Sequence, residues 1–574
     1  MIFSGLALGL SSKKASAMPA GPHEMIVTQP DGTEFLAQPW GDERASGLET
    51  AEGYSIGQQD DGWWVYKVPE SQDGLSTISS LSELRVEIDS APDVALQIDQ
   101  ISLEQNPQKF LQSVGGERPS QDGFDSLPPL SPNNPAPMPA IRVNTGSQPV
   151  LVILTYFDDR SSRTNIEDFQ NKFFGPAKSV KDYYAKASYN LVQLVPAAEN
   201  SGTANDGIVG WLNLGPTHPN PGNTNWTATR NIVSSALQKA DKFVNFAAFD
   251  KDGNNSISAH ELHIVIIVAG YEASYDGGAA KPNVWGHEWF LGVPVQADGV
   301  SLCAYNAQGS YTMFGEMMGN HSSTIGIMVH EMGHDFGWPD LYSSTSGAGL
   351  GTWDIMSFGG WSTGPGDSFL GETPPMPSAY LRMLMGWIDP NNPQQLIHAL
   401  DYQNTPIVMP SSSEEPFALM IPTDQNPSIY SGEFFIAENR QQIGYDASLP
   451  GAGGLVWHID ESVFNNNDPL HPRIRLVQAD GADHLKTAAN YGDPGDAFSA
   501  SSLNTRFGVG SALSSNFYNG QPSNVILEFG SGNGPGFASM MTSKSITVTA
   551  SLAEVVIFDP SKYPHHIYLP IAVR

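Results

Sequence analysis

The stretch from Val329 to Asp340 constrains this chain more than any other segment. It reads Val-His-Glu-Met-Gly-His-Asp-Phe-Gly-Trp-Pro-Asp, and its first part predicts a helix with an apolar side. Residues four apart lie on the same face of a helix, so the imidazoles of His330 and His334 can hold one metal ion at about 2.0 to 2.1 Å. This spacing is typical of zinc sites. We therefore expect the fold to place this helix beside a metal.

The residues around the two histidines predict the rest of a metal site. Glu331 points beside the metal, where it can take a proton from water that zinc acidifies to a pKa of about 7. Gly337 can adopt the left-handed conformation that ends a helix, and Pro339 prevents its continuation. The chain then turns back, which makes Asp340 the expected third ligand. Two imidazoles, one carboxylate and a water would form the open tetrahedral site of a catalytic zinc ion.

The alternative interpretation is an amphipathic helix whose histidines only form hydrogen bonds. In either case Ser322 or Ser323 is expected to cap the helix, and Asp335 is expected to face solvent. Further along, Met356 precedes a turn bounded by glycines. In zinc endopeptidases of the metzincin type such a turn lies beneath the metal, although a buried methionine usually belongs only to a core.

Composition and charge exclude several classes of function. The chain has 574 residues, with 60 Asp and Glu against 28 Lys and Arg, a net charge of −32. Such a field repels nucleic acids and anionic lipids. No segment approaches the roughly 20 consecutive apolar residues of a membrane-spanning helix. Cys303 is the only cysteine, so no intrachain disulfide can form.

The first 17 residues suggest export. Ile2 to Leu10 is a short apolar run, and Ala15-Ser16-Ala17 has the form of a signal-peptidase site. The usual basic leader is missing, since Lys13 and Lys14 follow the apolar run. We interpret residues 1–17 as a remnant of a signal peptide and expect a secreted, extracellular protein.

Changes in pattern along the chain predict three further parts. Residues 18 to about 112 suggest short strands, and Leu127 to Pro139 holds six prolines, typical of an extended spacer. Between about 147 and 395 strands mix with helices, which predicts an α/β or α+β unit. Its strands are expected at Val150–Leu154 and Leu262–Ala269, and its helix at 169–189 is expected to break at Gly175-Pro176.

From 396 to 574 the sequence shows repeated short strands between Gly, Pro and Asn turns, which favours a β-sandwich. The expected strands are Pro416–Ile421, Glu433–Glu438, Leu455–Ile459, Arg473–Gln478, Val525–Phe529 and Ser545–Ser551.

Residues 250–261 reproduce the twelve-residue calcium loop of EF-hand proteins. Oxygen-bearing residues occupy positions 1, 3, 5, 7, 9 and 12, namely Asp250, Asp252, Asn254, Ser256, Ser258 and Glu261. Asn255 replaces the usual glycine, and asparagine tolerates the left-handed conformation needed there. The exit resembles a strand and not a second helix, which makes Glu261 the weakest of the predicted ligands. The alternative is a turn rich in Asp and Asn.

Other residues invite weaker hypotheses. A second acidic cluster can bind another calcium ion or form an ordinary turn; it comprises Asp480, Asp483, Asp493 and Asp496. His287 lies between tryptophans, where it can line a cleft or simply pack. His458 is expected to be structural, and Cys303 has no visible base partner and is not proposed as a nucleophile.

With the zinc stretch and the Met356 turn in view, the chain resembles the immune inhibitor A family of secreted bacterial metallopeptidases. The agreement covers most of the chain from about 18 to 510. Similar segments outside the zinc stretch are Ser179–Tyr184, Ala187–Tyr189, Phe249–Asn254, Trp338–Tyr342, Met385–Ile388, Glu438–Gln441 and Gly453–Asp460.

The resemblance implies an α+β chain with a zincin or metzincin-like catalytic domain at 147–395. It also implies an N-terminal propeptide at 18–140, a β-sandwich domain at 396–574 and proteolysis of protein or peptide substrates outside the cell. The zinc ligands become His330, His334 and Asp340, with Glu331 as the base and Met356 as the turn methionine. Asp340 stands where many metzincins have a third histidine.

The propeptide interpretation has a chemical consequence. Residues 1–140 contain no cysteine, so latency would have to use a carboxylate, a backbone oxygen or steric occlusion. Two other functions compete with a protease: a calcium-stabilised surface adhesin with a decayed protease domain, and a non-proteolytic zinc hydrolase. The intact set of ligands and Glu331 argue against the adhesin.

Overall fold

A computed structural model describes residues 18–42, 46–72, 75–89, 144–305, 308–344, 347–402, 406–421, 432–499, 503–508, 511–521, 523, 525–530 and 546–552. They form two compact units. The first contains Gly146–Tyr184 and Val192–Asp340 with the described residues before 90, and the second contains Ala185–Leu191, residues 144 and 145, and the described residues from Leu341 onward. The predicted signal remnant and the proline-rich spacer lie outside the described residues.

The N-terminal part of the first unit is a six-stranded antiparallel sheet in which each strand pairs with the next. Its turns at Asp31-Gly32 and Asp61-Gly62 have glycine φ angles of 91° and 90°, which glycine adopts without steric cost. Val27, Phe35, Leu48 and Trp64 help to form its core. The strands are β1 (Met25–Thr28), β2 (Glu34–Gly41), β3 (Ser46–Thr50), β4 (Ser55–Gln58), β5 (Trp64–Gln72) and β6 (Leu75–Arg85).

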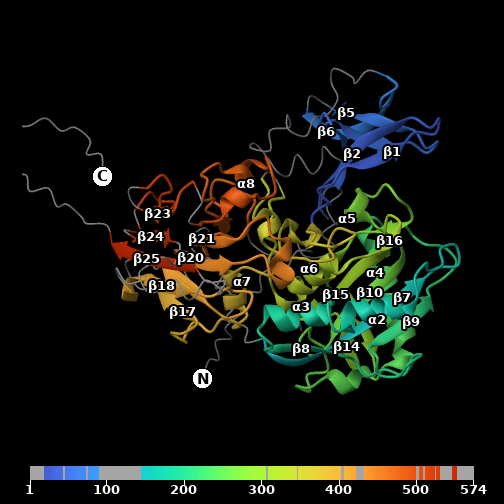
Figure 1. Cartoon of the computed structure of the whole chain (residues 1–574). Helices are drawn as coiled ribbons and strands as arrows, with labels where there is room; N and C mark the ends of the chain where they lie inside the picture. Colours follow the sequence, from blue (N-terminus) through green and yellow to red (C-terminus); the bar gives the residue numbers. More distant parts are fainter. Residues whose placement is uncertain are drawn as a thin grey trace, which may run out of the picture. The chain divides into compact units, whose positions relative to one another are not determined.

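A mixed sheet forms the centre of the rest of the first unit. Strands β7 (Gly146–Tyr156), β10 (His263–Glu272) and β15 (Tyr311–Met318) run parallel and lie side by side (Figure 1). β7 contains the predicted run Val150–Leu154, and β10 contains the predicted run Leu262–Ala269 except for Leu262. Both runs are buried, as expected for a parallel sheet covered on both faces.

Shorter strands complete this sheet. β8 (Val192–Pro196) and β9 (Ile208–Asn213) pair parallel with β7, and β12 (His287–Trp289) pairs antiparallel with β15. β11 (Asn283–Val284) pairs with β10, and β16 (His321–Ser322) pairs with β15. β13 (Val295–Ala297) and β14 (Val300–Leu302) form a separate two-stranded sheet.

Helices flank the strands in sequence order. The predicted break at Gly175-Pro176 is confirmed, because α2 (Ile166–Phe174) ends at Gly175 and α3 (Val180–Ala187) follows. The other helices of this unit are α4 (Trp226–Ala240), α5 (Ala273–Asp276) and α6 (Ile325–Phe336), with short 3-10 turns at Asp241–Phe243 and Phe246–Phe249. Helices and sheets mix, as predicted for this part of the chain.

The second unit contains two sheets that share one core. One has the order β17 (Leu396–His398), β19 (Ala418–Ile421), β20 (Glu433–Arg440), β21 (Gly453–Asp460) and β22 (Ile474–Leu476); the other has β18 (Pro406–Met409), β25 (Ile546–Leu552), β24 (Val525–Gly530) and β23 (Arg506–Gly508). Met409, Phe435 and Phe529 are buried in the same cluster. Each strand predicted from the sequence overlaps an observed one. The β-sandwich name and the boundaries near 140 and 395 stay predictions.

The second unit also holds α7 (Ala379–Leu384), α8 (His484–Thr487) and five short 3-10 turns, at Gly351–Trp353, Phe358–Trp361, Ala399–Tyr402, Gly444–Ser448 and Pro494–Asp496. Among the residues that the structure describes, no helix combines the length and apolar character needed to cross a bilayer.

Candidate metal centre

Helix α6 carries the two predicted histidine ligands through the interior of the first unit. All of its residues from Ile325 to Phe336 are buried. It ends where the sequence predicts, at Gly337, whose φ of 103° lets its N–H return to the carbonyl of His334 at 2.8 Å. The predicted cap was wrong: Thr324 is the N-cap residue and makes no side-chain cap, whereas the Ser323 hydroxyl donates to the Gly315 carbonyl.

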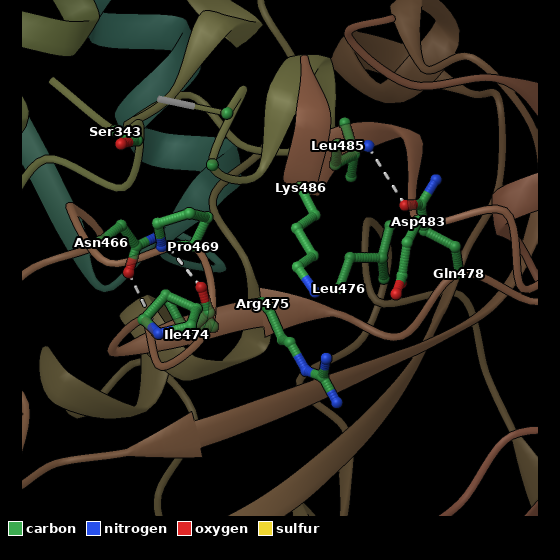
Figure 2. A pocket seen from close by; sticks show the side chains of 13 residues that line it. Ser343, Asn466, Pro469, Ile474, Arg475, Leu476, Gln478, Asp483, Leu485 and Lys486 are labelled. Atoms are coloured by element: carbon green, nitrogen blue, oxygen red, sulfur yellow. Dashed lines mark hydrogen bonds between the residues drawn. The ribbon is translucent and has the colours of Figure 1, made fainter. Parts of the chain in front are cut away.

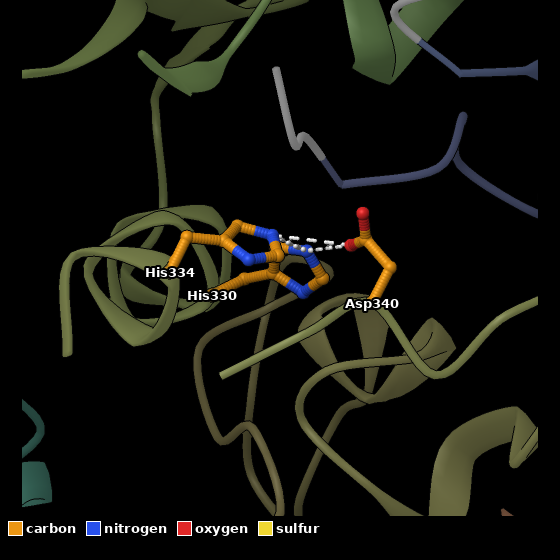
Figure 3. Close-up of side chains that lie close together, drawn as sticks. All are labelled: His330, His334 and Asp340. Atoms are coloured by element: carbon orange, nitrogen blue, oxygen red, sulfur yellow. Dashed lines mark hydrogen bonds and ion pairs between the residues drawn. The ribbon is translucent and has the colours of Figure 1, made fainter. Parts of the chain in front are cut away.

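Three possible metal ligands converge beside this helix (Figure 3). Nε2 of His330 and Nε2 of His334 lie 3.3 Å apart. Oδ1 of Asp340 lies 3.3 Å from the first and 3.1 Å from the second. Donors at tetrahedral corners about 2.0 to 2.1 Å from a zinc ion lie about 3.3 to 3.4 Å from one another. The spacing and the chemistry of the three donors therefore fit one zinc ion.

The turn after α6 fixes the orientation of the second histidine. Nδ1 of His334 lies 2.8 Å from the carbonyl oxygen of Trp338. A proton on Nδ1 donated to that carbonyl leaves Nε2 with its lone pair toward Asp340. Trp338 is held in turn by Tyr184 of α3, whose ring stacks on it and whose hydroxyl donates to the Val329 carbonyl at 2.6 Å.

The site is largely buried, and Asp340 is the most exposed of its three ligand candidates. His330 and His334 are almost fully buried, whereas the Asp340 side chain is 13% exposed. Burial alone would raise the pKa of Asp340, but the two histidines outweigh it and hold that pKa below its usual range. Burial likewise lowers the pKa of His334, and Asp340 more than compensates and raises it. A cation at this position would replace the protons that the histidines otherwise share with the carboxylate.

Glu331 lies one residue after the first histidine and is completely buried. Its Oε1 accepts a hydrogen bond of 2.8 Å from the backbone N–H of Met18, at the start of the described N-terminal segment. The expected base is therefore in contact with a segment that the sequence assigns to a propeptide. The sequence gives no signal for this contact, since 313 residues separate the two partners.

Asp335 corrects the sequence prediction. It was expected to face solvent, but it is 3% exposed and is paired with Nδ1 of His263, while its other oxygen accepts from the Ser310 hydroxyl. Nε2 of His263 lies 2.8 Å from the side-chain oxygen of Gln148. The helix is buried on all sides, so the face opposite the metal also meets protein instead of water.

Met356 belongs to the second unit and is buried there. Its N–H donates to Asp354 at 2.7 Å, and its carbonyl accepts from the N–H of Leu341 at 2.7 Å. Leu341 directly follows Asp340 in the chain. The role of Met356 as a turn methionine stays a prediction.

The predicted calcium loop has the form of a compact oxygen cluster. Carboxylate oxygens of Asp250, Asp252 and Glu261 lie within 4.8 Å of one another. Asn255 has a φ of 60°, the left-handed conformation expected at that position. Glu261 also accepts from the Ser258 hydroxyl at 2.8 Å and from the Lys251 N–H at 2.7 Å. These bonds hold Glu261, the least secure of the predicted ligands, beside the two aspartates.

Two further predicted residues, Asn254 and Ser256, belong to the same loop. The Asn254 side-chain oxygen accepts from the Ser256 N–H at 2.8 Å, and its amide donates to Asp252 at 2.8 Å. The predicted strand after the loop is confirmed, because β10 begins at His263.

The second acidic cluster contains only two of the four predicted aspartates. Asp480 and Asp493 lie within 4.8 Å of each other and of His484, a residue that the sequence did not single out. Asp483 is the N-cap residue that precedes α8 and is not in this group. Asp496 is buried and accepts from Trp353 at 2.8 Å.

The other residues considered from the sequence are held by local contacts. His287 is buried between the Trp285 carbonyl, at 2.7 Å, and the Tyr311 hydroxyl, at 3.2 Å, and burial lowers its pKa to about 4. His458 pairs with Glu433 at 2.6 Å. Cys303 is buried, and burial raises the pKa of its thiol. None of these contacts assigns a catalytic role.

A small cavity lies in the second unit between Ser343 and the strand that carries Arg475 (Figure 2). Asn466, Gln478 and Lys486 also line it, and its volume is about 30 Å³. That space holds one or two water molecules. It is too small for a peptide or a cofactor.

Comparison with known proteins agrees with this geometry. The sequence model of the immune inhibitor A peptidase M6 catalytic domain matches residues 152–388, a range that contains α6 and all three metal-ligand candidates. Residues 152–388 are therefore similar to the catalytic domain of the immune inhibitor A peptidase family. Among curated relatives, Immune inhibitor A of Bacillus thuringiensis subsp. alesti is 28% identical over 172 residues.

Pre-pro-metalloprotease PrtV of Vibrio cholerae serotype O1 is 27% identical over 158 residues. The matched segments cover 27% and 25% of this chain. They span 24% of the Bacillus protein and 17% of the Vibrio protein, so the similarity of this chain to them is confined to a part of each.

Proposed function

We propose that this chain is a zinc-dependent endopeptidase that hydrolyses peptide bonds of extracellular proteins. The observation that carries the proposal is the convergence of His330, His334 and Asp340 within 3.3 Å of one another, with Glu331 on the same helix. The peptidase M6 match and the metalloprotease name of the Vibrio relative support it. Export rests on the sequence of residues 1–17.

The residues divide the chemistry between them. His330, His334 and Asp340 would hold zinc, which when bound supplies a Lewis acid that acidifies water and polarises a carbonyl oxygen. Glu331 takes one proton from the attacking water at its carboxylate and later gives it to the leaving amine. One water is consumed, and one C–N bond is replaced by a carboxylate and an amine. No covalent intermediate with the protein is required.

A Glu331→Ala variant tests this proposal. Zinc content should persist because the three ligands are untouched, while casein digestion should fall by at least about a hundredfold. Glu167→Ala, an exposed glutamate of α2, is the control and should digest casein like the unchanged chain. The two variants and the unchanged chain are assayed after removal of the N-terminal region. Each is measured with and without a chelator. Undiminished digestion by Glu331→Ala would place the base elsewhere, and no digestion by any chain would favour the adhesin.

We further propose that residues 18–140 act as a propeptide that keeps the enzyme latent. The hydrogen bond from Met18 to Glu331 supports this role, because it places the N-terminal segment against the carboxylate that is expected to act as the base. Of the three means of latency expected from the sequence, this contact is a form of steric occlusion. Activity measured before and after removal of residues 18 to about 140 tests the idea, and equal activities would dismiss it.

A further inference from the structure

The N-terminal sheet contacts the rest of the first unit through a surface distinct from the metal centre. Asn223, between β9 and α4, donates from its side-chain amide to the Ser46 hydroxyl at 2.7 Å and to the Asp42 carbonyl at 3.4 Å. Ala279, in the turn after α5, packs against the core of the N-terminal sheet. We call Asn223 and residues 273–279 the α5 platform.

The platform fits the sheet closely. A Cβ atom on Gly277 would lie 2.6 Å from the carbonyl oxygen of Gly47, so the backbones of α5 and β3 approach as near as glycine allows. Gly277 ends α5 with a φ of 63°. The turn that follows is held in place by Asp276, which is buried and accepts from the N–H groups of Gly278 at 3.0 Å and Ala280 at 2.9 Å. The α5 platform is therefore held in one conformation by its own hydrogen bonds and fits closely against β3.

A strap formed by residues 18–23 joins the platform to the metal centre. Ala20 donates to the Gly41 carbonyl of β2, and Gly21 donates to the Ser274 carbonyl of α5, both at 2.8 Å. Ala20 is buried in a small cluster with Ala273 and Trp285. The strap is thus bound on one side to the sheet and on the other to α5, so a well-docked sheet also places Met18 against Glu331.

We propose that the α5 platform is a docking site for the N-terminal sheet that keeps this sheet bound after the peptide chain between the two has been cut. The partner is the excised segment of this chain that carries β1 to β6. All the contacts named here are non-covalent and lie within residues 18–86 on one side and 223–331 on the other, so a cut between 90 and 143 removes none of them. The docking itself does not depend on the proposed function. Only the role of the bound segment as an inhibitor rests on it.

The experiment uses the full chain with a recognition site for a specific protease inserted into the proline-rich spacer at 127–139. After cleavage, size-exclusion chromatography should show both fragments in one peak. Asn223→Ala combined with Ala279→Asp removes the amide donor and places a charge against the apolar core, and should weaken the complex at least about tenfold so that the fragments separate. Thr224→Ala, an exposed neighbour of Asn223, is the matched control and should keep the fragments together.

Four outcomes are distinct. Fragments of the unchanged chain that separate at once overturn the proposal, and so does a double variant whose fragments stay together. Before cleavage the double variant should elute as the unchanged chain does and unfold at a similar temperature, which shows that the loss concerns docking and not folding. Co-elution that depends on the platform supports docking even if the released catalytic part digests no casein, an outcome that would count only against the proposed function.

Discussion

The carboxylate of Asp335 is paired with the imidazole of His263, which lies 72 residues earlier in the chain. This pair joins the last turn of α6 to the first residue of β10. The Ser310 hydroxyl and the Gln148 side chain satisfy the remaining atoms. The helix that carries both histidine ligands is therefore fixed to the sheet by a buried polar network.

We expect Asp335→Ala to destabilise the first unit by about 3 kcal/mol, because it leaves His263 and Ser310 buried without their shared acceptor. Urea unfolding followed by tryptophan fluorescence measures the change. Asp168→Ala, which breaks the partly exposed pair of Asp168 with Lys172 at 2.8 Å, is the control and should cost less than about 1 kcal/mol. Equal losses for the two variants would mean that the network contributes nothing specific.

The zinc proposal predicts a steep dependence on the third ligand. Asp340→Asn keeps the size of the side chain but removes its charge. Loss of a residue that only hydrogen-bonds to a metal ligand lowers metal affinity by up to about a hundredfold, so loss of a ligand's charge should lower zinc affinity by more than that. Competition with a fluorescent chelator measures the affinity. Asp158→Asn, at an exposed position of the same unit, should bind zinc unchanged. Zinc binding retained by Asp340→Asn would remove this residue from the ligand set.

Much of the centre was predictable because it depends on local sequence. The positions of His330 and His334 follow from the period of a helix, and the end at Gly337 follows from its conformational freedom. Asp335 was assigned to solvent because amphipathic helices usually have a polar face. That rule fails here because α6 is buried on all sides. Its Asp335 is paired with His263, which belongs to strand β10. Such a partner, like the contact of Met18 with Glu331, depends on tertiary packing and leaves no mark in the local pattern.

Glu272 predicts a pH dependence of stability. This buried carboxylate accepts from the N–H groups of Gly286 and Gly315 at 2.8 Å and from the Ser274 hydroxyl at 2.8 Å. Burial outweighs these bonds and raises its pKa from 4.5 to about 7. The folded state then holds one more proton than the unfolded state between these values, so this group's contribution is complete below about pH 4.5 and is lost as pH rises to about 7.

The loss from this one group amounts to at most about 3 kcal/mol. A Glu272→Gln variant carries no titrating group at this position, and its unfolding midpoint should fall less between pH 5 and pH 8 than that of the unchanged chain. The variant will also be less stable at every pH, because its amide meets N–H donors, so the comparison concerns the slope alone. Glu167→Gln, on the surface of α2, should keep the original slope. Parallel curves for Glu272→Gln and the unchanged chain would contradict the prediction.

The loop at 250–261 predicts stabilisation by calcium. Three carboxylates held within 4.8 Å of one another repel each other, and a bound divalent cation would remove that repulsion and couple the start of β10 to the turn before it. Calcium at a hundred times its dissociation constant should stabilise the unit by about 2.7 kcal/mol, seen as a rise in the unfolding midpoint. Asp250→Asn with Asp252→Asn should abolish this rise, whereas Asp493→Asn, in the cluster with Asp480 and His484, should leave it intact because that cluster lies in the other unit. The reverse pattern would place the ion in the second cluster, and no rise with any chain would reduce the loop to a turn rich in Asp and Asn.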